Sequence, residues 1–241
     1  MDINPNLPFL MRDLYVYDIE SCHYTILTNL GYNTDLIPID DKLERNKFIG
    51  LMMRDNPRLV EILRQVTTAT LNEYILRNKI KSDDIVLRQY DGIITTKQLK
   101  ETTTKYIPLP LRKTYQIFLS SIDRKSYLAY DGNKVTIKGI SNRYEGIDSI
   151  FKRLIKCNFA DRIETFKELQ RIKDFVLNSN DPELFCIPVG KKFCLFLKAY
   201  GQVEISPTLA RVMDVNDIDK NKYFQHYLVP FTQSIIYELL K

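Results

Sequence analysis

Two aspartates and a glutamate follow short apolar runs, in positions where carboxylates can do metal chemistry. Asp18 and Glu20 come directly after the strand-like run Leu14-Tyr-Val-Tyr17. Asp91 stands in Tyr90-Asp-Gly92, between two further apolar runs. Carboxylate oxygens are the ligands that Mg²⁺ prefers. If the two strands lie together, Asp18 and Asp91 hold a divalent metal ion between them.

The helices and strands that position these residues can be predicted from local composition and from the glycine, proline and capping residues that end or begin each element. β-branched and aromatic residues predict a strand ending at Asp18, followed by a helix from Ser21 to Leu30 that Gly31 ends. Residues 84–96 predict a hairpin with its bend at Tyr90-Asp-Gly92. Between these two elements, helices are expected over residues 42–53, capped by Asp40 or Asp41, and 58–78, after a break at Asn56-Pro57.

The second half of the chain is predicted to contain both strands and helices, with helices dominating toward the C-terminal end. We expect a short helix over 115–122, and strands over 125–130 and 134–138 around Asp131-Gly-Asn133. Helices are expected over 150–157 and 160–178, then a short β region over 185–199, then a last helix capped by Asp219. A shift in composition near residue 145 predicts two domains, 1–145 and 146–241.

Composition restricts the class of protein. The 241 residues are 44% hydrophobic and 27% charged, with a net charge of +5, which permits a sizeable core and nucleic-acid partners. The sequence contains no run of about 18 apolar residues, so we expect no membrane span and no membrane partner. The N-terminus lacks the pattern of a signal peptide, so a cytoplasmic protein is expected. Four cysteines without a CxxC pair predict reduced, partly buried thiols, and two histidines make zinc improbable. Richness in Ile, Lys, Asn and Tyr hints at a phage genome.

Several segments, in order, resemble motifs of family B DNA polymerases. Asp18-Ile-Glu-Ser-Cys-His-Tyr-Thr-Ile26 is similar to motif A, and Gln89-Tyr-Asp-Gly-Ile-Ile94 is similar to motif C. Lys125-Ser-Tyr127 resembles the Lys-x-Tyr motif, and Ile137-Lys-Gly-Ile140 the strand after it. The tail from Val189 to Pro230 is similar to the end of the thumb. The resemblance covers nearly the whole chain.

The resemblance implies a fold and a set of roles. The fold would be α+β: an antiparallel-sheet polymerase palm with a reduced helical fingers hairpin, 42–78, followed by a mainly helical thumb. Its implied substrates are a DNA primer–template and a dNTP, and its implied cofactor is two Mg²⁺ ions. The implied metal ligands are Asp18, Asp91 and the carbonyl of Ile19. By this resemblance, nucleotide contacts would come from Ser21 and from His23 at the steric-gate position, and DNA contacts from Lys125 and Tyr127. As basic residues outside motif A and the Lys-x-Tyr motif, Arg45 and Lys47 of the hairpin are expected to face the nucleotide, and Lys138 and Arg143 to contact DNA.

The chain also departs from the family, and these departures leave other functions open. The fingers motif Lys-x-x-x-Asn-Ser-x-Tyr-Gly is absent, and Gln89 occupies the position of the first motif C aspartate. A second polymerase chain would therefore supply fingers and exonuclease. Alternatively, the chain is an inactive DNA-binding or assembly subunit of a phage complex. Tyr17-Asp-Ile-Glu-Ser21 also resembles the first motif of a DEDD-type 3′–5′ exonuclease, but the later motifs of that family are missing where they are required.

Ordinary structural roles compete with the catalytic ones. Asp91-Gly92 is a common turn dipeptide. Glu20 is expected to pair with a cation rather than ligate a metal, and His23 to be a half-buried histidine. The aromatic residues Tyr223, Phe224, Tyr227 and Phe231 are expected to pack in the core.

Overall fold

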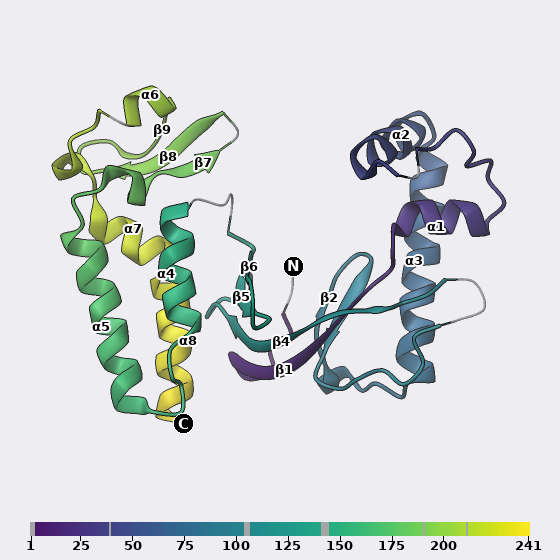
Figure 1. Ribbon diagram of the computed structural model, residues 1–241, viewed down its shortest axis with the longest axis horizontal. Helices are drawn as coiled ribbons and strands as arrows, with labels where there is room; N and C mark the ends of the chain where they lie inside the picture. The colour runs from purple at the N-terminus through teal and green to yellow at the C-terminus, as the bar shows by residue number, and fades with distance from the viewer. Residues whose placement is uncertain (1–2, 39, 104–106, 141–144, 190, 211) are drawn as a thin grey trace. The chain divides into compact units, whose positions relative to one another are not determined.

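The computed structural model of the chain (Figure 1) describes residues 3–38, 40–103, 107–140, 145–189, 191–210 and 212–241. The chain forms two compact units. One unit is Leu14–Thr114, and the other combines Tyr115–Lys241 with the N-terminal residues up to Asp13.

The unit Leu14–Thr114 contains the predicted strand, helices and hairpin. Its helices are α1 (Cys22–Asn29), α2 (Lys42–Asp55) and α3 (Pro57–Arg77), followed by the 3₁₀ turn η1 (Ser82–Asp84). Asp41 caps α2 by accepting from the N–H groups of Leu43 and Glu44, as predicted. Asn56 caps α3, and Pro57 occupies its first turn, where no N–H is needed. A buried apolar cluster fills the space under these helices, with Ile26, Leu63 and Tyr74 among its most buried members.

One antiparallel sheet contains the strands on which the motifs lie. It is built from β1 (Leu10–Asp18), β2 (Ile85–Arg88), β3 (Gly92–Thr95), β4 (Leu111–Ser120), β5 (Tyr127–Tyr130) and β6 (Val135–Lys138), in the order β2-β3-β1-β4-β5-β6. The hairpin predicted over 84–96 is confirmed as β2 and β3, and the pair predicted over 125–138 is confirmed as β5 and β6.

The short helix predicted over 115–122 is wrong, because these residues continue strand β4. Ile117 to Ser120 pair with Tyr130 to Tyr127 of β5. Tyr115 and Phe118 are buried while Gln116 is exposed. A partner strand ten residues away and the high β propensity of Tyr, Ile and Phe decide the conformation.

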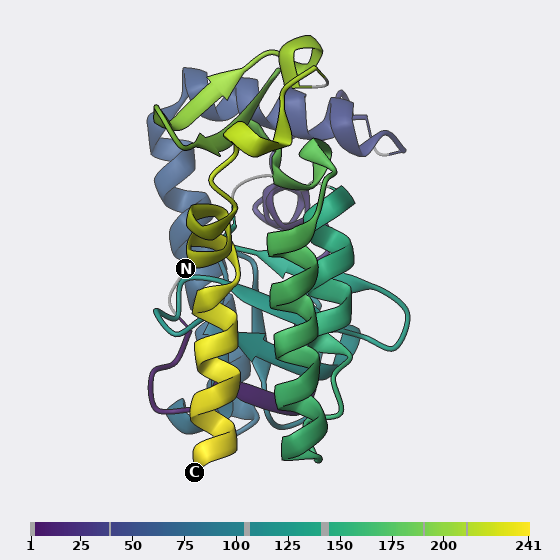
Figure 2. The same cartoon turned by 90° about the vertical axis from the view of Figure 1, so that its left-hand side faces the viewer.

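The second unit packs most of its helices and a small three-stranded sheet around a large apolar cluster. Its remaining elements are α4 (Glu145–Ile155), α5 (Arg162–Asn178), η2 (Pro182–Phe185), β7 (Ile187–Val189), β8 (Lys192–Leu197), β9 (Gly201–Ile205), α6 (Pro207–Ala210), η3 (Val215–Asp217), α7 (Lys220–Tyr227) and α8 (Val229–Leu240). Figure 2 shows the long helices α4, α5 and α8 of this unit. Tyr223, Tyr227 and Phe231 are buried, as predicted, and Asp219 caps α7.

The structure divides the chain at a different place from the change in composition. Leu119 of β4 and Leu128 of β5 share one apolar cluster with Phe151 of α4. These strands therefore belong with the helices that follow, and the compact unit begins at Tyr115, whereas the change in composition lies near residue 145. The cysteines are free, as predicted, and all four are buried. No helix in the described part of the chain is long and apolar enough to cross a membrane.

Candidate active site

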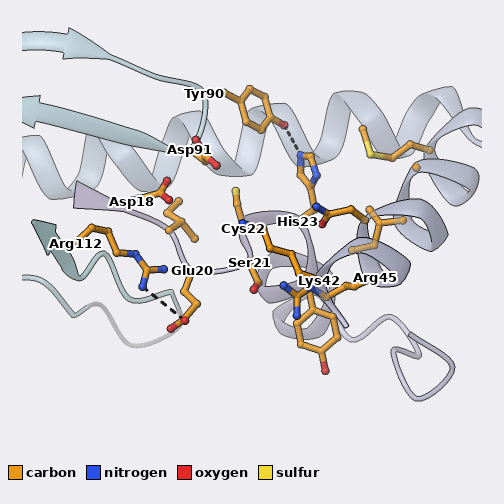
Figure 3. Close-up of a pocket in the computed structure, with 16 residues that line it drawn as sticks. Asp18, Glu20, Ser21, Cys22, His23, Lys42, Arg45, Tyr90, Asp91 and Arg112 are labelled. Atoms are coloured by element: carbon orange, nitrogen blue, oxygen red, sulfur yellow. Dashed lines mark hydrogen bonds and ion pairs between the residues drawn. The ribbon is translucent and has the colours of Figure 1, made fainter. Parts of the chain in front are cut away.

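Asp18 ends β1, and Asp91 lies in the bend directly before β3, the strand that pairs with β1. Asp18 is the last residue of β1, and its Cα is opposite that of Gly92, the first residue of β3. The Ile19 N–H donates a hydrogen bond to the Asp91 carbonyl at 2.8 Å, and the Gln89 N–H donates to the Gly92 carbonyl at 2.9 Å. The tight hairpin and this bond between strands fix Asp91 beside Asp18. Figure 3 shows both carboxylates at the same cavity.

Gly92 allows this close approach of the two strands. A Cβ atom at this position would lie 2.3 Å from the Tyr17 carbonyl oxygen and 3.2 Å from Asp18 Oδ1. Both neighbours are held by the sheet, so neither can move away cheaply. The Asp-Gly pair is therefore a turn dipeptide and a requirement of the candidate site at once.

Gly92→Ala is expected to lower the free energy of unfolding by about 1–3 kcal/mol, because the added methyl group forces the strands apart beside Asp18. Urea denaturation measures this loss. Gly50→Ala is the matched control: its Cβ meets nothing within 4 Å, and alanine favours a helix, so a gain of about 0.5–1 kcal/mol is expected. Equal stability of Gly92→Ala and the unmodified protein would contradict the described strand contact.

The surroundings of Asp18 disfavour the charged form of its carboxyl group. Its Oδ1 atom is buried, and no hydrogen-bond partner for it is found in the described part of the chain. Burial raises the pKa of Asp18 to about 6, the neighbouring Asp91 carboxylate adds to the rise, and Arg112 opposes it. A cation placed between the two carboxylates would offset their mutual repulsion. It would also give the buried Asp18 Oδ1 atom an electrostatic partner.

Glu20 turns toward a cation, as predicted, and away from the aspartate pair. Its carboxylate forms an ion pair with Arg112, at the start of β4, at 3.6 Å (Figure 3). The Glu20 side chain is 68% exposed. This geometry does not favour an Asp-x-Glu exonuclease site, in which both carboxylates face the same metal ion.

Helix α1 begins at the cavity and carries His23. Ser21 has a left-handed backbone conformation, with φ 47°, and its side chain does not cap the helix. His23 Nε2 lies 3.3 Å from the Tyr90 hydroxyl, and the two rings meet edge to face at 5.4 Å between centroids. Burial lowers the pKa of His23, with Asp91 opposing the change. A neutral, half-buried histidine therefore forms one wall of the cavity together with Tyr90.

One face of α2 completes the cavity, and sequence reasoning identified only part of it. Lys42, Arg45, Asn46, Ile49 and Met53 line the cavity from this helix. Their spacing of three, four and seven residues is the signal that marks one helical face. Lys47, expected to contact the nucleotide, does not line this cavity and pairs with Glu44 at 2.5 Å.

The resulting cavity has a volume of about 770 Å³ and contains three acidic and three basic side chains. The acidic ones are Asp18, Glu20 and Asp91, and the basic ones are Lys42, Arg45 and Arg112. Ser21, His23 and Tyr90 line it as well. Sequence reasoning had not assigned Arg112 or Tyr90 to the site. A cavity of this size and charge suits a ligand that combines phosphates with a metal ion.

The predicted DNA-contacting residues lie in the other unit. Lys125 and Lys138 are exposed. Tyr127 is paired with Lys138 across β5 and β6, but it is only 1% exposed and its ring stacks on Phe118 at 4.7 Å. The structure therefore places the Tyr127 ring in the core. Arg143 lies outside the described residues.

The donor atoms at the cavity fit Mg²⁺. Nowhere in the described ranges do three or more His, Cys, Asp or Glu side chains gather to hold a metal. Mg²⁺ is commonly bound through one or two carboxylates together with waters and substrate phosphates. Two adjacent aspartates meet that requirement on the protein side, and the buried Oδ1 of Asp18 has no hydrogen-bond partner within the described ranges.

Comparison with solved structures defines the class of fold. The chain is similar to the family B DNA polymerase from the hyperthermophilic archaeon Pyrobaculum calidifontis, with a TM-score of 0.51 and 12% sequence identity. The match covers 98% of this chain and 46% of that polymerase, so the chain spans about half the length of the structure it resembles. The fold is therefore a distant polymerase-like fold. No curated protein matches this chain.

The family follows from the sequence. The family model of the bacteriophage PBS1 gene 130 protein matches residues 4–199, which is most of the chain. The chain belongs to this phage protein family.

Proposed function

We propose that this chain is the palm and thumb of a family B-like DNA polymerase and transfers a nucleotide to a primer 3′-hydroxyl. The observation that carries the proposal is the placement of Asp18 and Asp91 side by side, with no hydrogen-bond partner for the buried Asp18 Oδ1 among the described residues. The polymerase-like fold agrees with it.

Each side chain at the cavity has a role in this proposal. Asp18, Asp91 and the Ile19 carbonyl would hold two Mg²⁺ ions, which, when bound, neutralise the charge that develops during phosphoryl transfer. Lys42 and Arg45 would attract the triphosphate of a dNTP from α2. The ring of His23, held by Tyr90, would lie against the sugar, and Ser21 would contact the nucleotide from the start of α1.

DNA would be held through its phosphates, by contacts that do not depend on sequence. The exposed Lys125 and Lys138 are suited to this role, and Arg143 is expected to share it. The fingers motif Lys-x-x-x-Asn-Ser-x-Tyr-Gly is absent between Asp18 and Asp91. We therefore propose that a second chain supplies the fingers and the exonuclease, and that the assembly works in the host cytoplasm.

A second candidate function is an inactive DNA-binding or assembly subunit. It is favoured by Gln89, which replaces the first motif C aspartate, and by the absence of the fingers motif. Primer extension separates the two functions: the chain, alone and with each other replication protein of its phage, is incubated with a primer–template, dNTPs and Mg²⁺. Extension that is lost in Asp91→Asn supports the enzyme, and Mg²⁺-independent DNA binding without extension in any combination supports the subunit.

A further inference from the structure

Among the described residues that line the cavity, Arg112 is the basic residue that lies on the sheet, and it already has a carboxylate partner. It stands at the second position of β4, and its side chain is 34% exposed. The nearest nitrogen-to-oxygen distance to Glu20 is 3.6 Å, beyond the length of a strong charge-assisted hydrogen bond. For an ion pair this exposed, the paired arrangement of the two side chains is favoured over the separated one by at most about five-fold. The pair therefore positions Arg112 without holding it tightly.

Two carboxylates, those of Asp18 and Glu20, interact electrostatically with the Arg112 guanidinium. Lys42 and Arg45 face the same cavity from α2, so an anion entering it meets cations from the sheet and from the helix (Figure 3). When the charge of Asp18 and Asp91 is compensated, Glu20 is the remaining carboxylate among the described cavity residues that competes for Arg112.

We infer that Arg112 binds the triphosphate of the incoming nucleotide and that Glu20 is a competing anion that the ligand displaces. Arginine suits this exchange, since its planar fork of N–H donors matches a phosphate as well as a carboxylate. A triphosphate carries more charge than Glu20 and offers two oxygens to the same guanidinium. The identity of the ligand rests on the proposed function, but the exchange between Glu20 and a polyphosphate does not require turnover.

Equilibrium binding in EDTA tests the exchange without catalysis. A fluorescent dNTP and inorganic tripolyphosphate are titrated into the full chain at fixed ionic strength. Arg112→Gln is expected to weaken the binding of both about ten-fold or more, because a charge-assisted bond to phosphate is lost. Glu20→Gln is expected to tighten binding about two- to five-fold. In the double variant, Glu20→Gln is expected to bring no gain, because Glu20 acts only through Arg112.

A matched Arg–Glu pair elsewhere in the same unit controls for net charge. Arg77 pairs with Glu73 at 2.6 Å on α3, and both side chains are about half exposed and absent from the cavity lining. Arg77→Gln and Glu73→Gln are expected to leave dNTP binding within two-fold. Equal effects at the two pairs would mean that only net charge matters, and would overturn the inference.

Three results separate this inference from its alternatives. Unchanged dNTP affinity in Arg112→Gln overturns it, and so does an undiminished Glu20→Gln gain in the double variant. Weaker binding of a single-stranded primer oligonucleotide with unaltered dNTP affinity would assign Arg112 to the DNA backbone and also overturn it. If the predicted binding pattern appears but no combination of chains extends a primer, the inference stands and the proposed polymerase activity fails.

Discussion

Replacing Asp91 with asparagine is expected to reduce Mg²⁺-dependent primer extension at least about 1,000-fold, in whichever assembly of chains shows extension. Asparagine keeps the size of the side chain but removes the charge that would hold a cation beside Asp18. Metal ions contribute several kcal/mol to phosphoryl transfer, and about 4 kcal/mol corresponds to this loss of rate.

The design of the Asp91 experiment separates catalysis from folding. Single-turnover extension of a labelled primer gives the rate. Asp83→Asn is the matched control, because Asp83 is exposed, lies in the 3₁₀ turn before β2 and does not line the cavity. Affinity for primer–template DNA is expected to stay within a few-fold in both variants. Extension by Asp91→Asn at the unmodified rate would show that Asp91 only closes a turn.

Asp18→Asn is expected to stabilise the metal-free protein at pH 8 and to abolish its stabilisation by Mg²⁺. In the folded protein, burial raises the pKa of the Asp18 carboxyl from its ordinary value of 3.8 to about 6. Its favourable contribution is therefore complete below about pH 4 and is lost as pH rises through about 6. A two-unit shift corresponds to at most about 3 kcal/mol, and solvent screening at this half-buried site lowers our expectation to about 1–2 kcal/mol.

Urea denaturation in EDTA at pH 5 and pH 8 measures this effect. The variant is expected to exceed the unmodified protein in stability at pH 8, and by less at pH 5. Adding Mg²⁺ at pH 8 should stabilise the unmodified protein and Asp83→Asn, and leave Asp18→Asn unaffected. A lower stability of Asp18→Asn at pH 8 would mean that the carboxylate is a structural partner within the fold, and would count against a metal site.

Local features of the sequence predict the elements that carry the aspartates. The apolar run before Asp18, the Asp41 cap, the break at Asn56-Pro57 and the Asp91-Gly92 bend all act within a few residues, and each is found where it was expected. Strand β4 was predicted as a helix because its conformation depends on pairing with β5, a partner outside the segment itself. Tertiary pairing overrides local preference at that point.

The residues that line the cavity could be predicted from the sequence only where a single helix or a single motif contributes them. The face of α2 follows from helical spacing once the helix is known, and it includes Lys42 and Asn46 as well as Arg45. The pairing of Glu20 with Arg112 joins residues far apart in the chain, so no local pattern identifies the partner. Tyr127 was expected to contact DNA because Lys125-Ser-Tyr127 resembles the Lys-x-Tyr motif, but its burial is decided by packing on Phe118 of the neighbouring strand.

Crystals of the protein soaked in Mn²⁺, with diffraction recorded at the manganese absorption edge, test the metal site most directly. An anomalous peak is expected between the side chains of Asp18 and Asp91, within about 2.0–2.4 Å of an oxygen from each. The peak should be missing from Asp18→Asn crystals soaked in the same way. A fully occupied Mn²⁺ ion elsewhere on the molecule, with none at this pair, would contradict the account.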